Sequence, residues 1–221
     1  MFNIKEINDA KHIVISIPNH ASISSLASAS ALYTYFLQLH KKVSLHCSYF
    51  DYGVHLDFIP WKDKIKTVYP SSADYEINTF TPRSVFAFFI REQVKINEKM
   101  ATSLYAGLID NTDAFSKGVD GTVFAMAEVL VKAKADTKKC SDNLIHYQTY
   151  AILKLKAKLL SKIQLVDDAS HAVFMLNDED LLKSGAKVDD AKSVFKEALG
   201  LPSVTSVSII YNNKTIMKEE I

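Results

Sequence analysis

A strand, a helix and a second strand follow one another near the start of the chain, and this succession limits the fold more than any other feature. Residues 12–17 (HIVISI) form a short β-branched run ending at Pro18, which is typical of a buried parallel strand. Apolar residues then recur at helical spacing over 25–39, and 43–49 reads as the second strand. Two parallel strands joined by a helix take a right-handed crossover. The sequence therefore predicts an α/β fold built on a mainly parallel sheet.

The remaining chain reads as a helical middle followed by a return to α/β structure. We predict an N-terminal lobe over 1–141, a linker helix over 142–162 and a second α/β lobe over 163–221. Pro82 stands at a helix start, the position that proline tolerates best, and Asn212-Asn213 marks a hairpin turn. The further predicted strands are 54–59, 65–69, 75–79, 171–176, 204–211 and 215–218, and the further predicted helices are 84–93, 97–110, 121–133, 143–162, 178–183 and 188–199.

Composition narrows the class of protein. The formal net charge is +1, which argues against a strongly basic surface for duplex nucleic acid. Cys47 and Cys140 are far apart in the sequence and form no CxxC motif, which favours a reducing compartment, and Cys47 lies in an apolar run typical of a small core residue. No signal peptide and no stretch of roughly 18 apolar residues is present. We therefore expect a cytoplasmic protein without a membrane segment.

Two segments carry a resemblance to a known family. The helix and turn containing 28–33 (SASALY) and 39–43 (LHKKV), and above all the helix 96–109 (INEKMATSLYAGLI), resemble the DHH-type phosphoesterases, in their oligoribonuclease and pAp-phosphatase branch. Residues 122–136 fit the continuation of the same pattern, and 153–182 resemble the start of the family's second lobe. The resemblance implies a DHH-like N-terminal domain and a DHHA1-like second domain. The family's GGGH substrate loop would follow Ile221, so we expect a truncated second lobe.

The resemblance also implies two Mn²⁺ or Mg²⁺ ions held by Asp and His, but the matching positions lack these ligands. The family's Asp in its TDTG motif aligns with Asn111, its second-site Asp aligns with Asn78, and no Asp-His-His triplet occurs. Hard divalent cations require anionic oxygen ligands, which hydroxyl and amide side chains do not provide. In the first loop, one register places Pro18, Ser22 and Ser24 at the ligand positions, and the other places Ile17, Ala21 and Ile23 there.

Candidate ligand-binding residues remain in two places. His20 lies in the loop after the first strand, where an anion can meet the N-terminus of the following helix. Ser22 and Ser24 belong to the same loop and serve equally well as helix caps. The second place is the end of the helix 97–110, where the candidates are Asp110, Asn111 and Asp113. Each also has an ordinary interpretation, as a surface histidine, a cap or a solvated carboxylate.

Three functional hypotheses follow. The first is a catalytically degenerate DHH relative that binds a small phosphate-containing ligand or nucleotide, or assembles with itself or a protein partner, without a metal cofactor. The alternative is an active phosphoesterase on pAp or short oligonucleotides whose Mn²⁺ or Mg²⁺ ligands are rearranged, with His20, Asp110, Asp113, Asp51 and Asp74 as the pool. The third is a purely structural subunit. The missing ligands favour the hypotheses without catalysis.

Overall fold

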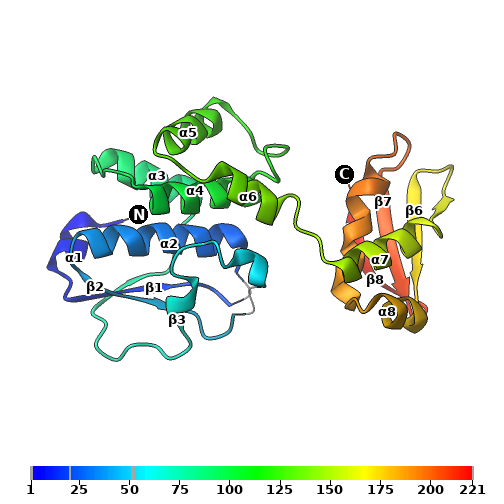
Figure 1. The fold of residues 1–221 in the computed structure, drawn as a ribbon, viewed down its shortest axis with the longest axis horizontal. Helices are drawn as coiled ribbons and strands as arrows, with labels where there is room; N and C mark the ends of the chain where they lie inside the picture. Colours follow the sequence, from blue (N-terminus) through cyan, green and yellow to red (C-terminus); the bar gives the residue numbers. More distant parts are fainter. Residues whose placement is uncertain (1, 20, 51–52, 221) are drawn as a thin grey trace. The chain divides into compact units, whose positions relative to one another are not determined.

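The computed structural model describes residues 2–19, 21–50 and 53–220, and the chain forms two compact units, Met1–Tyr147 and Gln148–Ile221. Each unit contains a four-stranded sheet and its own apolar core (Figure 1). The α/β class predicted from the sequence is therefore confirmed. Within the described ranges, no helix has both the length and the apolar character needed to cross a membrane.

The sheet of the first unit is wholly parallel. Its strands are β1 (His12–Ser16), β2 (Lys42–His46), β3 (Ile65–Lys66) and β4 (Tyr75–Ile77), in the order β3-β2-β1-β4. All three strand pairs run parallel. The predicted strand–helix–strand unit at the start of the chain is therefore present, and the carboxyl ends of the strands meet at one edge.

Helix α2 (Ile23–Gln38) lies on one face of this sheet, and a second layer of helices covers α2 (Figure 1). Small alanine and serine side chains let α2 fit between the two layers, since residues 27–31 are all buried. A helix that is buried on most of its faces shows little amphipathicity, as here. The other helices of the unit are α1 (Ile4–Asp9), α3 (Pro82–Arg91), α4 (Glu98–Asn111), α5 (Gly121–Lys132) and α6 (Thr137–Leu144).

Helix α3 contributes the aromatic part of this core. Phe88 and Phe89 are buried and pack around Tyr35 of α2, with ring centroids 5.5 and 5.4 Å from the tyrosine ring. Ile90, on the other side of α3, is exposed. Phe88 and Phe89 are therefore part of the core of the first unit.

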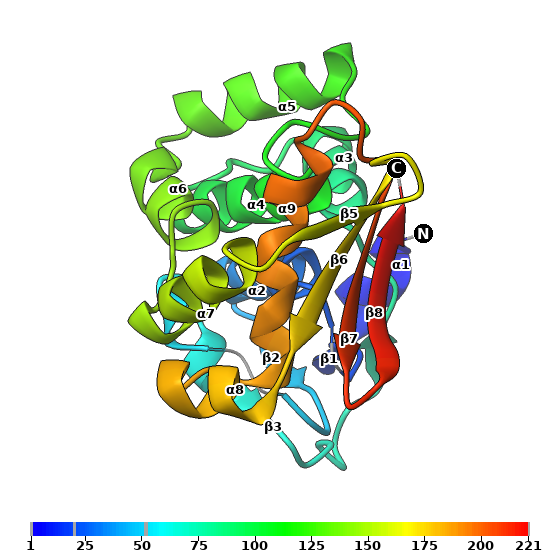
Figure 2. The ribbon, with the colours of Figure 1, turned by 90° about the vertical axis from the view of Figure 1, so that its right-hand side faces the viewer.

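The second unit has a mixed sheet. Strand order is β5-β6-β7-β8, with β6 and β7 parallel and the two outer pairs antiparallel (Figure 2). The β7–β8 hairpin turns at Asn212 and Asn213, both at positive φ, as predicted. The elements are α7 (Tyr150–Leu160), β5 (Gln164–Val166), β6 (His171–Leu176), α8 (Asp178–Ser184), the 3₁₀ helix η3 (Val188–Val194), α9 (Phe195–Leu199), β7 (Ser206–Tyr211) and β8 (Lys214–Glu220).

Lysines of α7 and Lys162, just after it, form ion pairs within this unit. Lys156 pairs with Glu197, and Lys162 contacts the buried carboxylate of Asp180 at 2.8 Å. Lys158 lies 3.8 Å from the same carboxylate. These contacts join α7 to α8 and α9.

Three local predictions are wrong. The predicted strand 54–59 is a 3₁₀ helix, η1 (Val54–Leu56), followed by a turn and a second 3₁₀ helix, η2 (Lys62–Lys64). The apolar residues that reach the core there are Leu56 and Ile59, three positions apart, which suits i→i+3 hydrogen bonding rather than strand alternation.

The predicted single helix 143–162 is also wrong, because α6 ends at Leu144 and α7 begins at Tyr150. The Thr149 side chain accepts a hydrogen bond from the backbone N–H of Ile152 and so caps the new helix. Helix 188–199 likewise divides into η3 and α9.

Candidate functional site

The candidate site lies where β1 ends and α2 begins. In parallel α/β sheets, ligands bind outside the carboxyl ends of the strands, close to helix N-termini. Here β1 ends at Ser16 and α2 starts at Ile23, so residues 17–19, 21 and 22 lie in the loop above the sheet edge. His20 of this loop lies outside the described residues.

A carboxylate of the chain itself occupies the N-terminus of α2. Asp110 Oδ2 accepts a hydrogen bond of 2.8 Å from the backbone N–H of Ser24, from a position 86 residues away in sequence. Asp110 is half-buried in the last turn of α4, which packs along α2. An anion is stabilised at a helix N-terminus because the first N–H groups and the helix dipole both favour negative charge. Asp110 therefore occupies the position at which a phosphate would bind at a helix N-terminus.

The serines of the loop complete this end of the helix. Ser22 is the N-cap, and its Oγ accepts from the Ser25 backbone N–H at 3.3 Å. The Ser22 and Ser24 hydroxyls are 2.7 Å apart, and Ser24 is buried. The first-turn donors at Ser24 and Ser25 are thus satisfied from within the chain.

The other two candidates lie apart from this cluster. Asn111 is exposed at the last position of α4. Asp113 follows in the next turn at positive φ, with a side chain that is 58% exposed and 3.7 Å from Lys117. The structure therefore brings together Ser22, Ser24 and Asp110, but not Asn111 or Asp113.

Further polar groups at the carboxyl edge of the sheet were not predicted. Asn19 Oδ1 accepts from the Tyr49 backbone N–H at 3.0 Å, which joins the loops after β1 and β2. Ser16, the last residue of β1, has a buried hydroxyl without a hydrogen-bond partner among the described residues. The sequence signal for Ser16 is a polar residue at the end of an apolar strand.

The buried thiol at this edge is unreactive. Cys47 is fully buried just after β2, which confirms its interpretation as a small core residue. Burial raises the pKa of the Cys47 thiol, and a backbone hydrogen bond at Tyr49 opposes this in part. A thiol with a raised pKa is mostly protonated at neutral pH and is a weak nucleophile.

The side chains that the structure describes at this edge do not form a binding site for two divalent cations. Across residues 2–19, 21–50 and 53–220, no three His, Cys, Asp or Glu side chains come together as metal ligands would. Among the described residues, the edge presents hydroxyls, amides and the carboxylate of Asp110, which accepts a hydrogen bond from Ser24. Hard cations bind to several anionic oxygens.

Of the remaining pool of rearranged ligands, the described member, Asp74, lies away from this edge. Asp51 lies outside the described residues. Asp74 accepts hydrogen bonds from the backbone N–H groups of His12 and Lys11 at 2.9 and 3.0 Å, which places it at the amino edge of the sheet, opposite Asp110. These two bonds, that from His12 first, lower the pKa of the Asp74 carboxyl.

Comparison with known proteins gives a likeness of fold. No protein-family model and no curated protein matches the chain. An exopolyphosphatase-related protein from Bacteroides fragilis superimposes with a TM-score of 0.78 at 13% identity, over 94% of this chain and 78% of that one. A family II inorganic pyrophosphatase of Methanococcus jannaschii reaches a TM-score of only 0.38 at 13% identity, over 90% of this chain and 83% of that one, which is too low to carry an argument. The first likeness shows that this chain shares the fold of that protein, and it concerns the fold alone.

Proposed function

We propose that this protein is a catalytically degenerate relative of the DHH-type phosphoesterases that acts as a binding or assembly protein, without two-metal catalysis. The observation that carries the proposal is the hydrogen bond between Asp110 Oδ2 and the Ser24 backbone N–H. Among the described residues, the edge at which the family's metals and phosphate would lie therefore has the engaged carboxylate of Asp110 and several neutral oxygens.

The position of Asp110 favours assembly over phosphate binding at this edge. A phosphate that approached the N-terminus of α2 would meet the Asp110 carboxylate, and like charges at such short range repel strongly. It would also have to displace hydrogen bonds that Asp110 and Ser22 already make to the first turn. The family's scaffold is kept, while its anion-binding end is closed by the chain itself.

The test is a calorimetric titration with Mn²⁺, followed by assays of the same sample against pAp and a short oligoribonucleotide. We expect the unsubstituted protein to hydrolyse neither substrate. We also expect it to bind Mn²⁺ no more tightly than the Asp110→Asn variant does. Asp9→Asn is the matched control, because Asp9 is an exposed carboxylate of the same unit. Tight Mn²⁺ binding together with hydrolysis, both lost in Asp110→Asn and kept in Asp9→Asn, would show an active phosphoesterase with a rearranged site and would refute the proposal.

A further inference from the structure

Residues 67–74 connect β3 to β4 across the sheet of the first unit. The two strands are parallel and lie at opposite edges of the sheet, so the chain must run back from the carboxyl edge to the amino edge. Such crossovers usually need about a dozen residues or more and contain a helix, whereas this shorter connection contains neither helix nor strand. We call residues 67–74 the strap.

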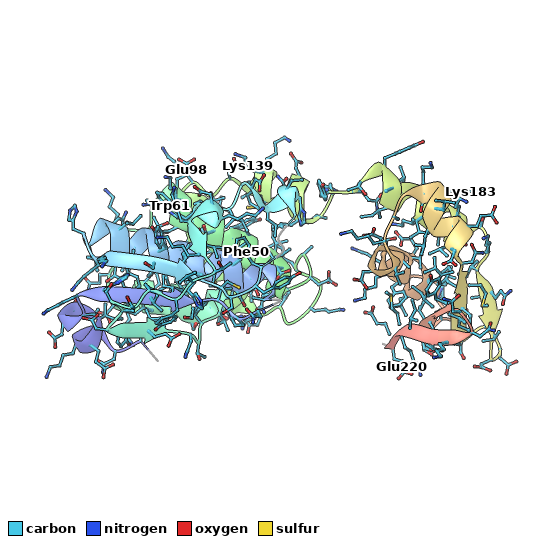
Figure 3. All side chains as sticks on the ribbon, turned by 90° about the horizontal axis from the view of Figure 1, so that it is seen from below. Phe50, Trp61, Glu98, Lys139, Lys183 and Glu220 are labelled. Carbon is cyan, nitrogen blue, oxygen red and sulfur yellow. The ribbon has the colours of Figure 1, made fainter. Side chains whose placement is uncertain are left out.

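The strap lies on the face of the sheet opposite α2. The connection from β1 to β2 and the connection from β3 to β4 run across the sheet in opposite directions, so right-handed crossovers place them on opposite faces. Figure 1 shows α2 above the sheet and the strap below it, and Figure 3 views the first unit from below, on the side of the strap. The strap therefore lies over the face that α2 leaves uncovered.

Strand β1 presents different residues to the two faces. Ile13 and Ile15 belong to the apolar core on the side of α2. Side chains alternate along a strand, so His12, Val14 and Ser16 point to the face of the strap. Val14 is fully buried there, and the Ser16 hydroxyl is buried without a hydrogen-bond partner among the described residues. This face thus has buried groups that solvent would reach if the strap opened.

The buried ring of His12 attaches the strap to the sheet. Its Nδ1 lies 2.8 Å from Ser72 Oγ of the strap, and its Nε2 lies 2.9 Å from Ser44 Oγ of β2. Lys42 Nζ donates to the same Ser72 hydroxyl at 3.0 Å. The Ser72 hydroxyl therefore accepts from the ammonium and donates its own proton to Nδ1, which leaves Nε2–H to donate to Ser44. This set of contacts suits the neutral imidazole.

The surroundings of the ring disfavour its protonation. The charged groups that act on it are Lys42 of β2, Lys66 of β3 and Asp74 of the strap. Burial is the main cause that lowers the pKa of His12, and the Lys42 charge is the next, while a backbone hydrogen bond at Ser72 opposes them in part. A protonated ring would direct a second cationic donor at the Ser72 hydroxyl. Protonation therefore weakens the attachment of the strap.

Backbone hydrogen bonds report whether the strap is closed. The Asp74 carboxylate accepts from the N–H groups of Lys11 and His12 at 3.0 and 2.9 Å, and the Asp74 N–H donates to the His12 carbonyl at 3.1 Å. The first two bonds lower the pKa of the Asp74 carboxyl, so this carboxylate stays ionised in mild acid. At the other end of the strap, the Tyr69 ring packs 5.2 Å from the ring of His46.

We propose that the strap is a pH-sensitive cover of this face, closed while His12 is neutral and opened when His12 is protonated. Opening exposes Val14 and Ser16 to solvent, while the sheet and α2 remain folded. The inference rests on contacts that do not involve Asp110 or Ser24, so it does not depend on the proposed function.

Hydrogen exchange of the full chain at different pH values, corrected for the intrinsic exchange rates, tests the proposal. The amides to follow are those of Lys11, His12 and Asp74, because their hydrogen bonds join the strap to β1. With an ordinary histidine pKa of about 6.5 in the open state, protection of these amides should fall about tenfold between about pH 7.5 and about pH 5.5. The amides of residues 23–38, in α2, should keep their protection.

Two variants identify the titrating group. His12→Gln should remove the pH dependence, because the glutamine amide keeps one neutral donor and one neutral acceptor at every pH. His46→Gln is the matched control, since His46 also contacts the strap, through Tyr69, and this variant should keep the pH dependence. Circular dichroism checks that both variants fold.

The unsubstituted protein by itself can overturn the proposal. It does so if the strap amides are equally protected at both pH values, or if the amides of α2 lose protection to the same extent, which would show unfolding of the whole unit. A pH dependence that persists in His12→Gln, or that disappears in His46→Gln, would likewise refute the role of His12.

Discussion

Gly107 marks the point at which α4 comes closest to its neighbours. A Cβ at this position would lie 2.9 Å from Pro82 Cγ of α3 and 3.3 Å from Ala27 Cβ of α2. Contacts under 3.0 Å do not occur between real side-chain carbons, so any larger residue must push the helices apart. The glycine that forms part of the family-like "YAGL" pattern is therefore explained here by packing.

Gly107→Val is expected to lower the free energy of unfolding by about 1–3 kcal/mol, because it overpacks a close helix contact. Gly121→Val is the matched control, since a Cβ there meets nothing within 4 Å. Urea denaturation of both variants measures the difference. Equal stability of the two would mean that α3 can move aside without cost.

His12 is the other residue whose surroundings predict a measurable effect. Its buried ring contacts Ser72 Oγ at 2.8 Å and Ser44 Oγ at 2.9 Å, and Lys42 Nζ donates to the same Ser72 hydroxyl at 3.0 Å. Burial, followed by the nearby Lys42 charge, lowers the pKa of His12 below its ordinary value. The ring therefore joins the segment before β4 to the sheet in its neutral form.

Stability should consequently fall as the pH drops below about 6.5, the ordinary histidine pKa. A base with a lowered pKa in the folded state binds protons more readily when unfolded, so acid favours unfolding, while the full stability is present above this pH. Urea denaturation between neutral and mildly acidic pH measures the slope. His12→Gln should flatten it, and His146→Gln, at an exposed position, should not. An unchanged slope in His12→Gln would assign the pH dependence to other groups.

At the scale of elements, the contact between Asp110 and Ser24 joins the end of α4 to the start of α2. The two helices are packed along each other, and the Ser30 and Ser103 hydroxyls, 2.9 Å apart, connect them further along. The carboxylate satisfies a first-turn N–H that would otherwise lack a partner in a half-buried place. It thus has the role of an N-cap supplied by a different helix.

Asp110→Ala should therefore lower the free energy of unfolding by about 1 kcal/mol, the usual cost of losing a cap. Asp110→Asn should cost less, because its amide oxygen still accepts a hydrogen bond. Chemical denaturation of both variants, beside Asp9→Ala as an exposed carboxylate control, gives the comparison. A stability of Asp110→Ala equal to that of the control would show that solvent replaces the carboxylate.

The elements themselves were largely predictable, and the contact between them was not. Periodicity located α2 and α4 because each has caps and apolar residues that the local sequence displays, with Ser22 and Asn97 as N-caps. The break after α6 was missed, although Thr149 is a local cap signal. The apolar pattern of residues 54–59 is compatible with both a strand and 3₁₀ turns, because the structure of so short a run depends on the core residues that it packs against.

In the candidate site, too, the local features were predictable and the contacts between distant residues were not. Ser22 and Ser24 were predicted as loop residues at a helix start. The role of Ser22 as N-cap is a local property, and Ser24 is the second residue of α2. The hydrogen bond from Ser24 to Asp110 spans 86 residues, and no local pattern indicates it. The indole of Trp61 likewise donates to Thr34 Oγ1 of α2, a contact that spans 27 residues and that no local pattern indicates.

At the scale of the whole molecule, each unit has a core formed entirely from its own residues. The first core contains the β1–β4 sheet and α2–α6, and the second joins α7, η3 and α9 to β6 and β7. In the second unit, the buried carboxylate of Asp180 accepts from Lys162 Nζ at 2.8 and 3.0 Å. Separate cores predict that a local destabilisation stays within its own unit.

Hydrogen exchange of the full chain tests this separation. Asp180→Ala should raise exchange in residues 148–221, because removing the buried carboxylate takes away the partner that joins α7 to α8, at a cost of about 1–2 kcal/mol given that Lys162 can still reach solvent. Gly107→Val should raise exchange in residues 2–147 instead. Each variant thus serves as the control for the other. If either substitution raised exchange equally in both ranges, the two units would unfold together, and stability would have to be treated as a property of the whole chain.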